Sequence, residues 1–212
     1  MVYKSIFDYM KDDETFKDAY NTCIAMEKNI IMGLANTSIG VARSASEIFI
    51  RLVIEKEDKD FYKELNSQVD QYGKKKNPTL NQMIRGAVDR GLILNHIFNK
   101  YKTVKNSGNA NIHGNKLEQY DLDDSKNIHE YLFDIARDCY NKYHKNNPVK
   151  IKYRYCLDGE YDIEFSPKEK DFILRCIHTH EIPKETLKES LESKTIFVPI
   201  NLFNEIKTKS GE

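Results

Sequence analysis

The sequence predicts a mainly α protein: an antiparallel helical bundle over residues 1–146, followed by a small α+β module with a β-hairpin over residues 147–212. Two observations predict this division. Up to residue 145, apolar residues recur every three or four positions, the spacing that gives a helix one buried face. Beyond residue 148, apolar and charged residues alternate, which is typical of strands.

The composition limits the possible functions. The 212 residues include 33 Lys and Arg and 33 Asp and Glu, so only a local patch could attract a polyanion. No apolar stretch approaches the ~18 residues that a membrane span needs, and we therefore expect a cytoplasmic protein without membrane contact. Four widely spaced cysteines suit reduced thiols in that compartment: Cys23, Cys139, Cys156 and Cys176.

The N-terminal half reads as a series of helices. One or two are expected over residues 3–32, and a strongly patterned one runs from Ser38 to Glu57. Arg43 and Glu47 lie four residues apart on this second helix. The simplest interpretation is an intrahelical ion pair, and the alternative is a role in a polar site.

A charged region follows. It contains a short predicted helix over residues 61–72 that ends at Gly73, and then the run Lys74-Lys75-Lys76. The lysine run suits a solvated loop, and phosphate contact is the alternative. Two further helices are predicted over residues 80–90 and 92–101.

The stretch from Tyr101 to Gly114, YKTVKNSGNANIHG, gathers polar side chains. We expect Gly108 to interrupt the helix, with Asn109 and His113 on one face four residues apart. Such a cluster indicates either a site or a buried polar lock between helices.

An acidic connector, EQYDLDDS, precedes a last bundle helix with apolar spacing from Ile128, and Asp124 or Ser125 is expected to cap it. The β-hairpin is expected from Val149 to Phe165. Its first strand would carry basic side chains on one face and tyrosines on the other: Lys150, Lys152 and Arg154, against Tyr153 and Tyr155. A basic face can follow a phosphate backbone, but a half-buried hairpin has the same pattern.

Other motifs carry little chemistry. Potential metal ligands recur at two-residue spacing, without a second cluster, at Cys176, His178, His180 and Glu181. We therefore predict no metal site and no cofactor. The sequence has no Gly-rich phosphate loop and no Ser nucleophile elbow.

Three segments occur in an order that resembles a known family. They are VARSASEIFIRLV, then LNQMI with RGLI, and then KNSGNANIHG before an acid-rich loop and a final helix. Over roughly residues 20–145 the chain is similar to a HEPN-like domain of unknown function, found at the N-terminus of type I restriction R subunits and in other prokaryotic defence proteins.

The resemblance implies a set of site residues. Gly108, Asn109 and His113 match the family loop, and Lys105 stands where that loop has Arg. Arg43 and Glu47 match the first helix of the motif. Many HEPN proteins are dimeric, metal-independent ribonucleases. In such an enzyme His113 would be the general acid or base, Lys105 would stabilise phosphate charge and Asn109 would orient the reacting groups.

Lysine keeps the positive charge of the family's Arg but loses its planar fork, which favours a binding role over cleavage. We therefore expect a defence- or mobile-element-associated module that binds RNA, DNA, a nucleotide or a protein partner, with Arg43, Glu47 and Gly108 in a structural polar site. The alternatives are the dimeric ribonuclease and a phage-type inhibitor that docks on a large host defence complex.

Overall fold

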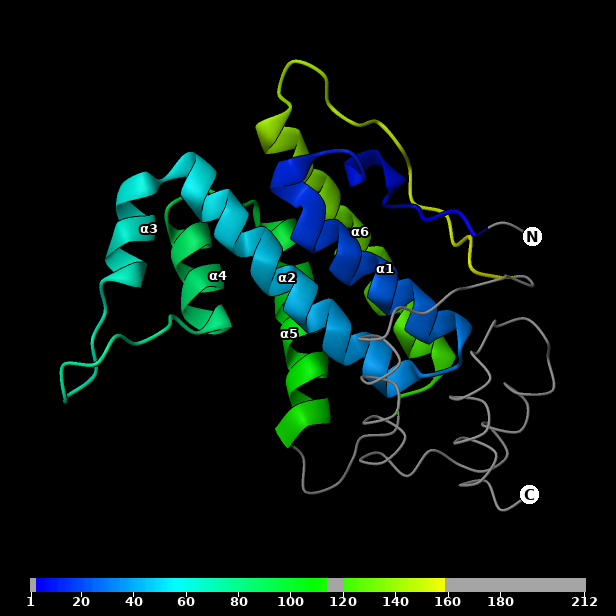
Figure 1. Cartoon of the computed structure of the whole chain (residues 1–212), viewed down its shortest axis with the longest axis horizontal. Helices are drawn as coiled ribbons and strands as arrows, with labels where there is room; N and C mark the ends of the chain where they lie inside the picture. Colours follow the sequence, from blue (N-terminus) through cyan, green and yellow to red (C-terminus); the bar gives the residue numbers. More distant parts are fainter. Residues whose placement is uncertain (1–2, 114–119, 159–212) are drawn as a thin grey trace.

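The computed structural model describes residues 3–113 and 120–158, without the side chains of residues 110–113. Within these residues the protein is a helical bundle, as predicted, preceded by short 3-10 helices (Figure 1). The 3-10 helices are η1 (Asp8–Met10) and η2 (Glu14–Phe16). The α-helices are α1 (Lys17–Ile31), α2 (Ala35–Glu57), α3 (Lys59–Asn66), α4 (Leu80–Asp89), α5 (Asn95–His113) and α6 (Leu122–Tyr143).

Helix α2 is the centre of the bundle, and α1, α5 and α6 all pack against it. It runs diagonally through the molecule in Figure 1, with α1 beside it and the α3–α4 pair near its C-terminal end. Small residues in α2, among them Ala42, Ala45 and Ser46, are fully buried. They let the neighbouring helices approach closely, and this packing explains why α2 is the most strongly patterned helix of the sequence.

Helix α3 is shorter than predicted. It ends at Asn66, because Phe61 and Leu65 are its only buried side chains and the next apolar residues, Val69 and Tyr72, are exposed. Gly73 therefore does not end a helix. It has a φ of 75° in the turn of the following loop, a conformation that glycine adopts without strain.

Helix α4 begins and ends close to the predicted residues. Thr79 and Gln82 form a capping box at its start, each side chain bonding the backbone of the other residue. Gly91, with a φ of 68°, follows its C-terminal end. At Gly86 the ring of Phe61 fills the space that a Cβ would occupy, which brings α3 against α4.

The predicted helix break at Gly108 is wrong, because α5 continues through it to His113. Gly108 is buried where α5 meets α2. A Cβ at this position would lie 2.5 Å from Cβ of Arg43 and 2.9 Å from its Cδ. The glycine thus allows two helices to approach, and its conformational freedom is not needed.

Helix α6 starts earlier than predicted, and its cap is neither Asp124 nor Ser125. Asp121 is the N-cap and forms a capping box with Asp124. Ser125 is fully buried instead, and its hydroxyl oxygen lies 3.0 Å from that of Ser38 on α2. This buried hydroxyl pair joins the start of α6 to the start of α2.

The first half of the predicted β-hairpin forms no strand, and the second half lies outside the described residues. The backbone of this segment bonds to side chains of α6 instead of to a partner strand. Asn141 bonds both the N–H and the carbonyl of Val149, at 2.7 and 3.2 Å, and Arg137 donates to the carbonyl of Ile151 at 2.9 Å. Further along, Leu157 is buried in the core. Residues 149–157 are therefore attached to the bundle; from residue 159 on, the predicted module lies outside the described residues.

Candidate functional site

Arg43 and Asn109 connect α2 and α5 at the family-like motif. Nε of Arg43 donates to Oδ1 of Asn109 at 2.7 Å, and the arginine side chain lies in the space left free by Gly108. Within the described residues, the terminal guanidinium nitrogens of Arg43 have no hydrogen-bond partner. The side chain is therefore held at one nitrogen while the others remain available for a ligand.

Lys105, one turn before Asn109, connects α5 to α4. Its Nζ donates to Oδ1 of Asn81 at 2.9 Å, and Asn81 lies in the first turn of α4. Both asparagines accept through Oδ1, and within the described residues their amide nitrogens have no hydrogen-bond partner and are donors that face no acceptor.

Four basic side chains from three helices gather here: Arg43 on α2, Arg85 on α4, and Lys102 and Lys105 on α5. We call them the basic cluster. Partial burial lowers the pKa of Lys105, and the positive charges of Arg85, Lys102 and Arg43 lower it further. The other three cations thus lie close enough to Lys105 to repel its charge.

In the part of the chain that the structure describes, no carboxylate forms an ion pair with the basic cluster. The predicted pair between Arg43 and Glu47 is wrong. Glu47 pairs with Arg51, one turn further along α2, at 3.0 Å. Arg43 bonds to Asn109 across the helix interface instead, so Glu47 neutralises none of the four charges.

This arrangement suits an anion. Guanidinium and ammonium groups form charge-assisted hydrogen bonds to phosphate, and the planar fork of an arginine can bind two oxygens at once. Arg85 and Lys102 are exposed, whereas Arg43 and Lys105 are half-buried between helices. The cluster therefore combines two cations fixed in position with two that reach into solvent.

The predicted site residues fall into two groups. Arg43, Lys105, Gly108 and Asn109 meet at the α2–α5 contact. His113 is the last residue of α5, and its side chain lies outside the described residues.

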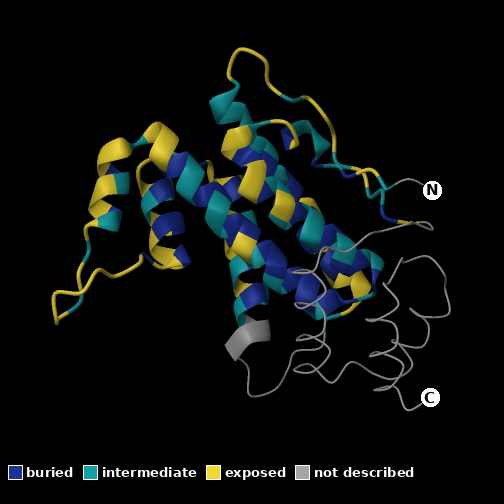
Figure 2. Ribbon diagram, viewed as in Figure 1, coloured by how far each residue is buried: buried dark blue, intermediate teal, exposed yellow. Residues whose placement is uncertain are grey.

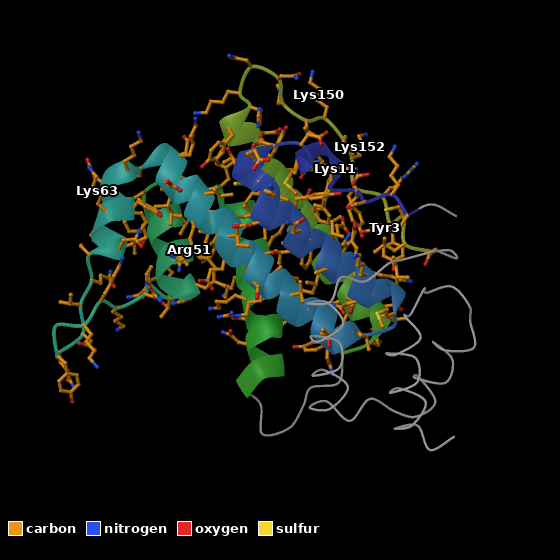
Figure 3. The ribbon with its side chains drawn as sticks, viewed as in Figure 1. Tyr3, Lys11, Arg51, Lys63, Lys150 and Lys152 are labelled. Carbon is orange, nitrogen blue, oxygen red and sulfur yellow. The ribbon has the colours of Figure 1, made fainter. Side chains whose placement is uncertain are left out.

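The basic residues of the segment after α6 do not join this site. Lys150, Lys152 and Arg154 are exposed, while Tyr153 and Tyr155 pack against the core. Figure 3 shows Lys150 and Lys152 on the same side of the molecule as the N-terminal segment, away from α4. They form a separate basic surface.

Sequence reasoning missed Arg85, Lys102 and Asn81. Lys102 precedes Lys105 by one helical turn, and that spacing alone predicts a shared face. No spacing predicts the contribution of Arg85 and Asn81, because they come from another helix and reach the site through the packing of α4 on α5.

Sequence reasoning also missed a second polar centre, buried between α1 and α6. Nε2 of His129 lies 2.9 Å from Oε1 of Glu27, and its Nδ1 lies 3.1 Å from the hydroxyl of Tyr153. The hydroxyl of Tyr3 donates to the other carboxylate oxygen of Glu27. Glu27 and His129 are both 0% exposed, so this network is closed to ligands and joins parts of the fold.

A pocket of about 410 Å³ opens at the C-terminal end of α6, and its lining includes Lys56, Lys142, His144 and Lys145. Three of these side chains have carboxylate partners. Nε2 of His144 lies 2.8 Å from Asp13, and Nζ of Lys145 lies 3.2 Å from Glu57. Lys142 lies 3.8 Å from Asp138. Within the described residues the basic cluster has no such carboxylate partners, which makes it the stronger candidate for an anion site.

The chain matches no protein-family model, no curated protein and no solved structure. Among the described residues, no helix is long and apolar enough to span a membrane, and no group of three metal-ligating side chains occurs. The cysteine and histidines around residue 178 lie outside the described residues. The site is thus characterised by its own geometry alone.

Proposed function

We propose that this helical bundle is a nucleic-acid-binding module, and that the basic cluster contacts the phosphate backbone. The observation that carries this proposal is the meeting of four basic side chains from three helices with no carboxylate partner among the described residues. Bringing like charges together costs free energy, and a polyanion offsets that cost.

The fixed position of the Arg43 side chain supports a contact with the phosphate backbone. Its bond to Asn109 restricts the side chain before a ligand arrives, which reduces the conformational entropy lost on binding. Because the sequence resembles prokaryotic defence domains, we propose RNA or DNA as the polyanion and a role in a defence system or a mobile element.

Binding is measured with labelled RNA and DNA oligonucleotides over a range of salt concentrations. One variant combines Arg85→Gln, Lys102→Gln and Lys105→Gln. The matched control combines Lys150→Gln, Lys152→Gln and Arg154→Gln, which removes the same charge from exposed positions on the separate basic surface.

We expect the cluster variant to bind at least about tenfold more weakly at low salt, with a log–log salt slope shallower by about two to three. The control variant should bind like the wild type. If the control loses affinity and the cluster variant does not, the nucleic-acid surface lies on the segment after α6. If only a mononucleotide or a protein binds, the proposal is wrong.

A ribonuclease is the second candidate, and one observation favours it. Because α5 is uninterrupted, Lys105, Asn109 and His113 follow one another at four-residue intervals along a single helix. The test is cleavage of labelled RNA in EDTA by wild type and His113→Ala. Cleavage that disappears in the variant would make the module an enzyme, whereas binding without cleavage would leave it a binding protein.

A further inference from the structure

The loop between α3 and α4 is a folded arm. The backbone N–H of Asp70 donates to the carbonyl of Lys74 at 2.8 Å, and that of Lys76 donates to the carbonyl of Gln68 at 2.8 Å. Val69 and Lys75 form an antiparallel bridge between the two sides. We call residues 68–76 the arm, which leaves the bundle in Figure 1 as a narrow extension beside α3 and α4.

The turn of the arm is fixed by one carboxylate. Oδ1 of Asp70 accepts from the backbone N–H of Tyr72 at 2.8 Å and from that of Lys74 at 2.9 Å. Gly73 supplies the positive φ that the turn requires. The arm is therefore ordered by its own hydrogen bonds, and it would lose little conformational entropy on binding.

The side chains of the arm are unusual for a solvated loop. Tyr72 is 78% exposed and Val69 is 60% exposed, although both are large and apolar. The lysines at positions 74, 75 and 76 are all exposed, and they form no ion pair within the described residues (Figure 2). An aromatic ring next to several free ammonium groups is the combination that single-stranded nucleic-acid sites use: the ring stacks on a base and the cations contact phosphates.

The arm leads directly into the proposed site. It ends a few residues before Leu80, the first residue of α4. That helix contributes Arg85 to the basic cluster and Asn81 as the partner of Lys105. A single strand could thus contact the arm and the basic cluster in succession. Unpaired bases expose the faces that a ring can stack on, whereas a duplex hides them.

We propose that the arm binds unpaired nucleotides, with Tyr72 stacking on a base and Lys74, Lys75 and Lys76 contacting the adjoining phosphates. This inference rests on the proposed nucleic-acid function and specifies its ligand as a single strand. A duplex should then bind more weakly than an unpaired strand of equal length.

The full chain is tested by equilibrium binding to labelled probes of equal length: a single strand, the same strand without bases, and a duplex. The variants are Tyr72→Ala and Tyr72→Phe, and Val69→Ala is the control, a nearby exposed apolar residue on the same arm. We expect Tyr72→Ala to weaken binding of the single strand by about 5-fold to 100-fold, as for the loss of one stacked base. Binding of the abasic strand should not change, and Tyr72→Phe and Val69→Ala should bind all probes like the wild type.

The outcomes separate this inference from the proposed function. If the cluster variant loses affinity while Tyr72→Ala binds the single strand normally, the arm inference is overturned and the cluster stands. If Tyr72→Ala weakens the base-containing and abasic strands equally, the ring does not stack and the inference is overturned. If Tyr72→Ala loses affinity for the single strand while its controls and the cluster variant do not, the arm is supported and the cluster is not the binding site. A wild-type protein that binds none of the probes overturns both.

Discussion

Nε2 of His129 on α6 lies 2.9 Å from Oε1 of Glu27 on α1, with both side chains fully buried. Tyr3 and Tyr153 complete the network from either end of the described chain. These four side chains join the N-terminal segment, two helices and the segment after α6. The network holds the N-terminal segment and the segment directly after α6 on the bundle.

Replacing Glu27 by Ala should strongly destabilise the fold. It removes the carboxylate that bonds the buried His129 and the half-buried Tyr3, and breaking such a buried pair costs about 3–5 kcal/mol. Glu130→Ala, at an exposed position next to His129, is the control and should change the free energy of unfolding by less than about 0.5 kcal/mol. Urea denaturation measures both, and equal losses would show that the buried network contributes nothing specific.

Gly108→Ala should destabilise the protein although alanine favours helices. The new Cβ would lie 2.5 Å from Cβ of Arg43. Because Cβ is bonded directly to the backbone, rotation of the Arg43 side chain cannot relieve this clash. Overpacking of this kind costs about 1–3 kcal/mol, against the roughly 1 kcal/mol that alanine gains over glycine in a helix. The variant should also bind oligonucleotides more weakly, because Arg43 is displaced.

Asn106→Ala is the matched control, an exposed position on the same helix. It should raise the free energy of unfolding by a few tenths of a kcal/mol, up to about 0.7. A Gly108→Ala protein as stable as this control would mean that α2 and α5 are not in close contact.

Lys105→Gln should make the unliganded protein slightly more stable while weakening binding. Burial and three neighbouring cations lower the pKa of Lys105, so its charged form is less favourable in the folded protein than in the unfolded chain. That cost is fully present below the lowered pKa and disappears as the pH rises to the unfolded value. At neutral pH the substitution should therefore raise the free energy of unfolding by up to about 0.5 kcal/mol.

Salt provides the check on this result. Added NaCl screens the repulsion, so it should raise the unfolding midpoint of the wild type more than that of Lys105→Gln. A variant that is less stable than the wild type at every salt concentration would show that the bond to Asn81 outweighs the repulsion.

Tyr143 should make stability fall at alkaline pH. Its hydroxyl donates to the carbonyl of Leu52 at 2.9 Å, and burial, with smaller contributions from neighbouring groups, raises its pKa to about 12. The folded protein therefore keeps a proton that the unfolded chain releases near pH ~10, so the stabilisation is complete below that pH and is lost as the pH rises to about 12.

Tyr143→Phe removes both the hydrogen bond and this titration. It should lower the free energy of unfolding by about 1 kcal/mol at neutral pH and lose less stability between neutral and alkaline pH than the wild type. Chemical denaturation at several pH values measures the difference. Tyr72→Phe, at an exposed position, should follow the wild-type curve, and a parallel curve for Tyr143→Phe would contradict the assignment.

Local pattern predicted the helices that carry a regular apolar stripe, and it failed where a residue acts across an interface. The predicted start of a helix at Leu80 and the apolar spacing of α2 are local, and both agree with the structure. Gly108 has the same sequence signature whether it breaks a helix or admits a neighbouring side chain. Only the position of Arg43 distinguishes the two.

Only part of the candidate site could be predicted, because some of its contacts form between helices. Helical spacing predicted a shared face for Asn109 and His113, and the family resemblance singled out Lys105 and Arg43. The hydrogen bond between Arg43 and Asn109, the choice of Arg51 as the partner of Glu47, and the arrival of Arg85 depend on how helices pack. Most of those contacts join residues that are distant in the chain. In the case of Glu47, two arginines on the same helix are equally spaced candidates for one carboxylate.

The sequence by itself determined that the part of the chain before residue 146 is a helical bundle, because the three-to-four-residue apolar repeat is a property of each segment alone. The tertiary structure decided which basic charges meet without a carboxylate partner among the described residues. Like charges on α2, α4 and α5 lie together because buried apolar faces dictate how those helices pack, and the repulsion is small beside that burial. The tertiary structure likewise decided that Glu27 and His129 are buried as a pair rather than exposed on two separate helices.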